Sequence, residues 1–279
     1  MTERQPSTRP RVAFVDSGLG LVGYADALLA LRPDASLILS MDPDNMPYGP
    51  RPHDEVRALV LNTARATLPY APDAIVVACN SASVHGLEAL RAELEPAIPV
   101  IGTVPAIRPA AATGGPVAVW ATAATTSSDY LRGLVDAFAS DIDTTAVACH
   151  GLAEAIEAAD HEEIDRSIAQ ALAGTSDEVR ALVLGCTHYG LVADRIQAAV
   201  GEGVLIFDSP EAVARQTLRR LGIDPAPDAE PAPIDAVLLS GRLGDLPEEL
   251  DAYAAGARLR AREPRRAAAG PLAPGSARP

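Results

Sequence analysis

Lysine is absent from this chain of 279 residues, so that all 23 basic residues are arginines. Pyridoxal-phosphate enzymes and Schiff-base aldolases form a covalent bond through a lysine amine, and a Walker A loop places a lysine on the phosphates of its nucleotide. The sequence therefore excludes these three classes. With 48% hydrophobic and 22% charged residues, the chain has the composition of a globular protein.

The chain also has fewer basic than acidic residues, and it has few cysteines. The 23 basic residues stand against 37 acidic ones, and the net charge of −14 repels phosphate backbones and anionic membranes. We therefore expect neither a nucleic-acid nor a membrane partner. The three cysteines, an odd number, are too few for a disulfide framework, which indicates reduced thiols and a cytoplasmic location. Residues 1–10 are polar and no run of about 18 apolar residues occurs, so we expect no signal peptide or membrane helix.

From residue 11 onward, short apolar runs alternate with longer segments of helical period, which is typical of an α/β fold with parallel sheets. Strands are expected at residues 12–15, 37–39, 74–78, 100–101, 117–120, 181–184, 204–207 and 237–239. Residues 75–81 resemble 182–188, since each is an apolar strand followed by a cysteine and small polar residues, and 12–17 resemble 204–209. We predict two similar α/β domains with parallel sheets, related by a pseudo-two-fold axis, with the active site between them.

Stretches rich in proline and glycine indicate where the domain boundaries lie. Residues 105–116 mark the first boundary, and residues 224–233 read as a linker before one last βα unit. We predict an N-terminal tail (1–10), a domain A (11–106 plus 210–260), a domain B (107–209) and a disordered basic C-terminal tail (261–279). A nucleic-acid contact through that tail is a minor alternative.

Cys79 and Cys186 each stand where a predicted strand ends and a helix begins. Ligand sites of open parallel sheets lie beyond the carboxyl ends of the strands. A helix N-terminus lowers the pKa of a thiol and so favours a thiolate, which is a usable base. Two opposed thiols can invert a carbon acid, one removing the α-proton from one face while the other donates a proton to the opposite face. Buried structural cysteines are the alternative, and Cys149, which lacks the polar context, is expected to be one.

Five motifs occur in the order and rough spacing of the bacterial glutamate racemases. They are Asp16-Ser17-Gly18, Pro47-Tyr48-Gly49, Cys79-Asn80-Ser81-Ala82, the turn from Thr122 to Thr125, and Gly185-Cys186-Thr187-His188-Tyr189. From about residue 12 to residue 250 the chain resembles this family. It departs from the family pattern at Leu21, Ser81 and Gly190, where glycine, threonine and proline are usual. Of these, the bulky Leu21 is expected to narrow the pocket.

The resemblance implies a racemase without cofactor or metal that interconverts L- and D-glutamate and supplies D-glutamate for peptidoglycan. Glutamate is then the small-molecule partner, and a homodimer is an assembly to test. By matching position, Cys79 and Cys186 are the implied acid/base pair, and Asp16 and His188 are accessory catalytic groups beside them. The implied substrate-binding residues are Asp16, Ser17, Tyr48, Gly49, Asn80, Ser81, Thr122, Thr125, Glu157, Thr187 and His188.

Other interpretations stand beside this one. The motifs around Asp16 and Tyr48, taken alone, are ordinary turns, and Glu157 alone is a solvated helix charge. Cys186 and His188 without a second cluster have poor spacing for zinc. A racemase of aspartate or another acidic amino acid is the first alternative function, although related aspartate racemases typically carry an acid where this chain has His188. A degenerate racemase fold acting as an interaction protein is the second, and the intact thiols argue against it.

Overall fold

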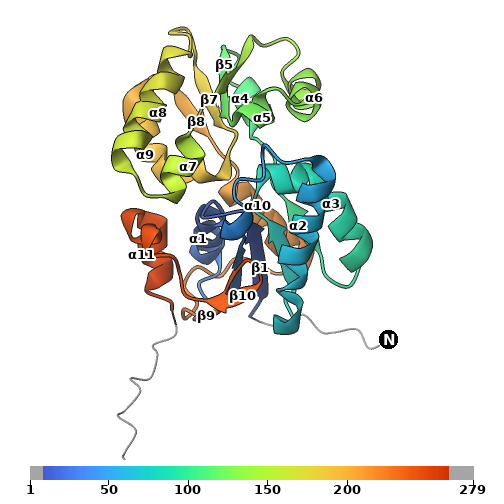
Figure 1. Ribbon diagram of the computed structural model, residues 1–279. Coiled ribbons are helices and arrows are strands. Elements are labelled where there is room, and N and C mark those ends of the chain that lie inside the picture. Colours follow the sequence, from blue (N-terminus) through green and yellow to red (C-terminus); the bar gives the residue numbers. More distant parts are fainter. Residues whose placement is uncertain (1–8, 264–279) are drawn as a thin grey trace, which may run out of the picture.

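The computed structural model describes residues 9–263 as two α/β lobes, each built around its own sheet (Figure 1). Residues 1–8 and 264–279, which make up most of both predicted tails, lie outside the described residues. Residues 261–263, which were predicted to belong to the C-terminal tail, are part of the described structure. The backbone carbonyl of Arg262 accepts a hydrogen bond of 3.0 Å from the N–H of Ile234.

The first sheet has six strands in the order β10-β9-β2-β1-β3-β4. These strands are β1 (Arg11–Asp16), β2 (Ser36–Met41), β3 (Ala74–Val77), β4 (Val100–Gly102), β9 (Ile234–Leu239) and β10 (Arg242–Gly244). All neighbouring strands are parallel except β9 and β10. The central strands are buried almost throughout, as expected for a parallel sheet covered on both faces.

The second sheet has four parallel strands in the order β6-β5-β7-β8. They are β5 (Val117–Ala121), β6 (Thr144–Ala148), β7 (Ala181–Leu184) and β8 (Leu205–Phe207). The predicted α/β class with parallel sheets is confirmed, and so are the eight predicted strands. Sequence patterning misses β6, an edge strand in which only Val147 is buried, because Val147 is also its one large apolar residue.

The predicted last βα unit is interrupted, because β9 first returns through a tight hairpin to β10, and the helix at residues 254–260 follows only after it. Ser240 and Gly241 connect the two strands, and their φ angles are 47° and 77°. Two consecutive residues with positive φ are typical of the type I′ turn, whose twist suits antiparallel strands. The Ser-Gly pair is thus the local signal for β10.

Helices cover both faces of each sheet (Figure 1). In the first lobe they are α1 (Leu21–Leu31), α2 (His53–Arg65), α3 (Asn80–Leu94), α10 (Pro210–Leu221) and α11 (Ala254–Arg260). In the second lobe they are α4 (Ile107–Ala111), α5 (Ala123–Thr126), α6 (Asp129–Phe138), α7 (Leu152–Glu157), α8 (His161–Ala173) and α9 (Ala193–Val200). No helix within residues 9–263 is both long enough and apolar enough to cross a membrane.

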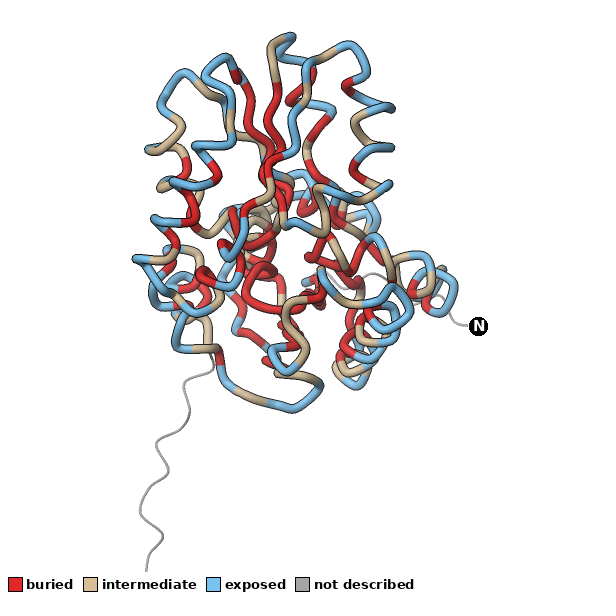
Figure 2. The backbone as a smooth tube through the Cα atoms, turned by 45° about the horizontal axis from the view of Figure 1, so that its top comes forward, coloured by how far each residue is buried: buried red, intermediate tan, exposed pale blue. Residues whose placement is uncertain are grey.

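One hydrophobic core extends through both lobes. Alternate residues of a strand face opposite sides of its sheet, so Phe14 packs toward α1 and α10 while Val15 packs toward α2 and α3. The cluster that contains Phe14 continues into the second lobe, where it includes Trp120 of β5 and Ile164 of α8. Figure 2 shows the buried backbone concentrated in the strands at the centre of both lobes. The lobes therefore stabilise one another through shared apolar burial.

Within the described residues, the chain passes between the lobes after β4 and again after β8. The hydroxyls of Thr103 and Ser209, one from each crossing segment, lie 2.9 Å apart. The hydroxyl of Tyr24 in α1 lies 2.9 Å from Thr103 Oγ1 and 2.8 Å from Ser209 Oγ. This closed triangle ties both crossing segments to α1, which starts beside the carboxyl end of β1.

Candidate active site

Cys79 and Cys186 occupy equivalent places in the two lobes. Each lies two residues after its strand, β3 or β7, in extended backbone conformation, and each directly precedes a helical segment. The helical segment after Cys79 is α3, and the one after Cys186 is the 3-10 helix η3 (Thr187–Val192). The similar local sequences thus fold in a similar way and place one thiol at the carboxyl edge of each sheet.

Both thiols line a single pocket, whose empty space is about 390 Å³ with the open solvent in it included. The lining residues are Ser17, Met46, Pro47, Tyr48, Gly49, Cys79, Asn80, Ser81, Thr122, Thr125, Ala153, Gly185, Cys186, Thr187 and His188. The structure therefore brings together all the predicted site residues except Asp16 and Glu157, which lie behind the lining and contact it. Met46 and Ala153 were not predicted. Met46 adjoins the Pro-Tyr-Gly motif, whereas no sequence signal marks Ala153.

Leu21 does not line this pocket, contrary to our expectation. It is fully buried in the core at the start of α1. The hydroxyl of Tyr48 also has a protein partner, because it donates a hydrogen bond of 2.8 Å to the carboxylate of Asp42. Only the remainder of the Tyr48 residue is left to contact a ligand.

The first thiol, Cys79, lies beside a buried carboxyl group. Asp16 Oδ1 accepts hydrogen bonds from the Ser17 N–H at 2.6 Å and from the Ser17 hydroxyl at 3.2 Å, and Ser17 Oγ is 3.9 Å from Cys79 Sγ. Burial raises the pKa of Asp16 from 3.8 to about 6. Burial and then the neighbouring Asp16 raise the pKa of Cys79 well above its ordinary value. The lowered pKa that we expected from the helix N-terminus is therefore wrong for this thiol, which stays protonated at neutral pH.

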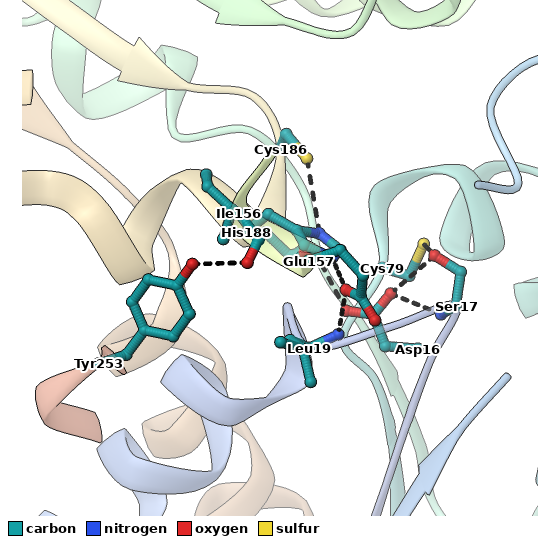
Figure 3. Close-up of polar contacts among 10 residues, drawn as sticks. Asp16, Ser17, Leu19, Cys79, Ile156, Glu157, Cys186, His188 and Tyr253 are labelled. Carbon is teal, nitrogen blue, oxygen red and sulfur yellow. Dashed lines mark hydrogen bonds and ion pairs between the residues drawn. The ribbon is translucent and has the colours of Figure 1, made fainter. Parts of the chain in front are cut away.

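The second thiol, Cys186, lies beside an imidazole ring. Its Sγ is 3.9 Å from Nδ1 of His188, and Nε2 of the same ring is 2.8 Å from Oε2 of Glu157 (Figure 3). Burial lowers the pKa of His188, but the contacts with Cys186 and Glu157 outweigh burial and hold this pKa well above its usual range. The ring is therefore positively charged at neutral pH and stabilises negative charge on the Cys186 sulfur.

Glu157 links the two lobes at this point. The same Oε2 that contacts His188 also accepts a hydrogen bond of 2.8 Å from the backbone N–H of Leu19, in the loop after β1 (Figure 3). A Cβ at Gly18 would overlap the Glu157 carboxylate, so the missing side chain permits this approach. Sequence reasoning reached Glu157 only through family resemblance, because its partners come from distant parts of the chain.

Asn80 makes a second contact between the lobes. Its Nδ2 donates a hydrogen bond of 2.7 Å to the carbonyl of Gly185. Its Oδ1 is buried and has no hydrogen-bond partner among the described residues, although Asn80 lines the pocket. A buried oxygen without a donor is costly, so Oδ1 is suited to accept a hydrogen bond from a ligand.

Hydroxyl groups complete the pocket. The Thr122 hydroxyl lies 3.0 Å from that of Thr125, and Thr122 Oγ1 caps α5 by accepting the Thr125 N–H. Thr187 donates a hydrogen bond of 3.2 Å to Asp16 Oδ2. Within residues 9–263, no three His, Cys, Asp or Glu side chains are grouped so that they could hold a metal ion.

The raised pKa of Asp16 predicts a pH-dependent gain in stability on mutation. Because the folded-state pKa of about 6 exceeds the usual 3.8, ionisation of Asp16 costs folding free energy as the pH rises through this window. The Asp16→Asn variant should be more stable than the unmodified chain by on the order of 2 kcal/mol at pH 8, and by much less at pH 4. Urea unfolding at both pH values measures this difference, and an equal effect at the two values would contradict the raised pKa.

Two glycines near the start of α1 predict opposite effects on stability. A Cβ at Gly20 would overlap Thr187 Oγ1, Asp16 Oδ2 and His188 Nδ1, whereas a Cβ at Gly23 meets nothing within 4 Å. The Gly20→Ala substitution should destabilise the fold by about 1–3 kcal/mol, since buried groups must move. Gly23→Ala, its matched control inside the helix, should stabilise the fold by about 0.5–1 kcal/mol. Urea denaturation checks both, and a stable Gly20→Ala variant would show that the loop adapts freely.

Residues 23–217 match the family described as Asp/Glu/hydantoin racemase. The glutamate racemase of Clostridium perfringens is 36% identical over 215 residues, which cover 75% of this chain and 82% of that protein. The glutamate racemase of Pseudomonas entomophila is 36% identical over 218 residues, with coverage of 76% and 81%.

Solved structures agree with these sequence comparisons. The Escherichia coli glutamate racemase in complex with L-glutamate and the activator UDP-MurNAc-Ala has a TM-score of 0.74 and 29% identity, and the match covers 88% of this chain and 92% of that one. The Thermus thermophilus enzyme in complex with β-chloro-D-alanine has a TM-score of 0.67 and 28% identity, with coverage of 92% and 96%. By sequence and by fold, therefore, this chain belongs to the Asp/Glu/hydantoin racemase family.

Proposed function

We propose that the protein is a glutamate racemase that moves the α-proton of glutamate between two thiols. The observation that carries this proposal is the single pocket with Cys79 at one lobe and Cys186 at the other. The 36% identity to proteins named glutamate racemase, and the likeness to a structure in complex with L-glutamate, support glutamate as the substrate.

The charges beside the two thiols support distinct resting states. The cationic ring of His188 favours a thiolate at Cys186, whereas burial and Asp16 keep Cys79 protonated. In one direction the Cys186 thiolate takes the α-proton of one enantiomer, and the Cys79 thiol gives its own proton to the opposite face of the α-carbon. When the product leaves, Cys186 is a thiol and Cys79 is a thiolate. This is the state of the enzyme that accepts the other enantiomer.

The remaining pocket residues suit an amino acid in the transition state. The Ser81 hydroxyl and one hydroxyl of the Thr122–Thr125 pair supply donors for carboxylate oxygens, on which negative charge grows as the proton leaves, whereas the hydroxyls of Ser17 and Thr187 already donate to Asp16. The unpaired Oδ1 of Asn80 can accept a hydrogen bond from the substrate ammonium group. Because these groups are held by the protein before the substrate arrives, little reorganisation is needed during the reaction.

The wider assignments belong to the same proposal. Supply of D-glutamate for peptidoglycan is the use that we propose for the product. The domain bounds, 11–106 plus 210–260 and 107–209, are supported by the strands, because each sheet draws all its strands from one of these sets. The cytoplasmic location, the homodimer and the absence of a cofactor stay predictions.

The substrate assignment is tested with purified, dialysed protein and no added cofactor or metal. We expect racemisation of L-glutamate with a kcat/KM at least about tenfold above that for L-aspartate, since one methylene alone is worth about 10-fold or more in discrimination. Circular dichroism or a coupled D-amino-acid assay measures both rates. A preference for aspartate would replace the proposal with the alternative acidic amino-acid racemase.

Serine substitutions test the two thiols separately. Both Cys79→Ser and Cys186→Ser should reduce racemisation by more than about a hundredfold, because a serine hydroxyl does not form the base. Each variant keeps one thiol, so it should still exchange the α-hydrogen of a single enantiomer for deuterium, and the preferred enantiomer should differ between the two. Cys149→Ala is the control and should retain activity, since Cys149 does not line the pocket. If both serine variants act on the same enantiomer, the opposed-thiol mechanism is wrong.

A further inference from the structure

We propose that Tyr253 is a positioning residue for the Cys186 thiol, an inference that rests on the proposed racemase function. Tyr253 lies between the 3-10 helix η4 (Glu248–Ala252) and α11, in the first lobe. The family match ends at residue 217, so this part of the chain lies beyond it.

The contact that carries the inference crosses between the lobes. The Tyr253 hydroxyl donates a buried hydrogen bond of 2.5 Å to the backbone carbonyl of Ile156, in the last turn of α7 (Figure 3). The Tyr253 ring is buried in the core cluster that also contains Ile156, Leu250 and Leu259. Burial, and then the charge of Glu157, raise the pKa of Tyr253 to about 12, so the phenol keeps its proton and remains a donor at neutral pH.

The end of α7 needs such support. This helix has only six residues, too few to be stable by its own hydrogen bonds. Soon after the helix ends, Ala159 has a φ of 51°, a left-handed conformation that costs about 1 kcal/mol or more in a residue with a Cβ. The turn has backbone hydrogen bonds of its own, including one of 3.1 Å from the Ala159 N–H to the Ile156 carbonyl. Two donors from the first lobe add to these: the Tyr253 hydroxyl binds the same carbonyl, and the Leu19 N–H binds the side chain of Glu157.

This turn acts most directly on the charge beside Cys186. Glu157 follows Ile156 directly, and its carboxylate contacts His188, whose other ring nitrogen faces Cys186. If the turn moves, the Glu157 contact weakens, the pKa of His188 falls, and the negative charge on the Cys186 sulfur loses support. Cys79 lies beside Asp16 and Ser17, and neither of these contacts Tyr253. The charges of His188 and Glu157 act on the pKa of Asp16 in opposite directions, so the environment of Cys79 should change less than that of Cys186.

The test introduces Tyr253→Phe, which keeps the ring and removes only the hydroxyl, into both one-thiol variants. In the Cys79→Ser background, where Cys186 is the remaining thiol, deuterium exchange at the α-carbon should fall about threefold to tenfold, the loss that corresponds to one hydrogen bond. In the Cys186→Ser background the exchange rate should change less than twofold. Tyr70→Phe, at the amino ends of the strands and away from the pocket, is the matched control and should leave both rates unchanged.

A double-mutant cycle tests the route through Glu157. Adding Tyr253→Phe to Glu157→Gln should reduce Cys186-dependent exchange no further than Glu157→Gln alone, because Tyr253 acts through that carboxylate. In the otherwise unmodified chain, Tyr253→Phe should move the alkaline limb of the kcat profile to lower pH, since the pKa of His188 falls. In every variant that still racemises glutamate, the kcat/KM values of racemisation must be equal for the two enantiomers, because the enantiomers have equal free energy; this equality checks the assay.

The outcomes separate this inference from the proposed function. Equal losses in the two one-thiol backgrounds, additive losses with Glu157→Gln, or no loss in either background would overturn the role of Tyr253 while leaving the racemase intact. Absence of glutamate racemisation in the unmodified chain would overturn the proposed function itself, and this inference with it. A selective loss confined to Cys186-dependent exchange supports both.

Discussion

The hydrogen bond from Asn80 to the Gly185 carbonyl is the contact on which the geometry of the site depends. It joins the residue after Cys79 to the residue before Cys186, so one bond of 2.7 Å fixes the two thiol loops relative to each other across the lobes. Gly185 fits at this position because it has no side chain. A Cβ there would lie too close to its neighbours, 2.8 Å from the Cβ of Ala121 and 2.9 Å from the carbonyl oxygen of Trp120. The proposed transfer of a proton between two sulfurs requires this accuracy, since a misplacement of about 1 Å can cost about a hundredfold in rate.

Around this fixed frame, the two halves of the site differ in charge although their backbones are alike. Burial, and then a neighbouring carboxyl group, raise the pKa of Cys79, while the imidazolium of His188, held by Glu157, lies 3.9 Å from the Cys186 sulfur. Equivalent strand-to-helix junctions would give both thiols the same protonation state, and two thiolates or two thiols cannot begin the transfer. The asymmetry therefore comes from side chains outside the repeated strand-cysteine pattern, namely Asp16 on one side and the His188–Glu157 pair on the other.

The sequence predicts what is local and misses what is assembled from distant segments. Apolar runs predicted eight strands, and the repeated strand-cysteine pattern predicted where both thiols stand. Edge strand β6 was missed because Val147 is its one buried residue, and β10 because its signal is a single Ser-Gly turn. The raised pKa of Cys79 was also beyond local reasoning, since burial and Asp16 outweigh the helix N-terminus only once the lobes have packed. The contacts of Glu157 with Leu19 and His188, and of Tyr253 with Ile156, join residues that no spacing rule connects.

Packing between the lobes also explains how the fold tolerates its buried charges. Moving the charged side chains of Asp16, Glu157 and His188 out of water costs several kcal/mol of free energy per ion, and the attraction between opposite charges offsets only part of this cost. The hydrophobic cluster shared by α1, α11, α7 and α8 offsets such costs by burying apolar surface from both lobes at once. The same cluster holds Tyr253 against Ile156 and, through the next residue, Glu157 against His188. A substitution in this shared core should therefore loosen the site as well as the fold, because the residues that stabilise the interface between the lobes also determine the charge beside Cys186.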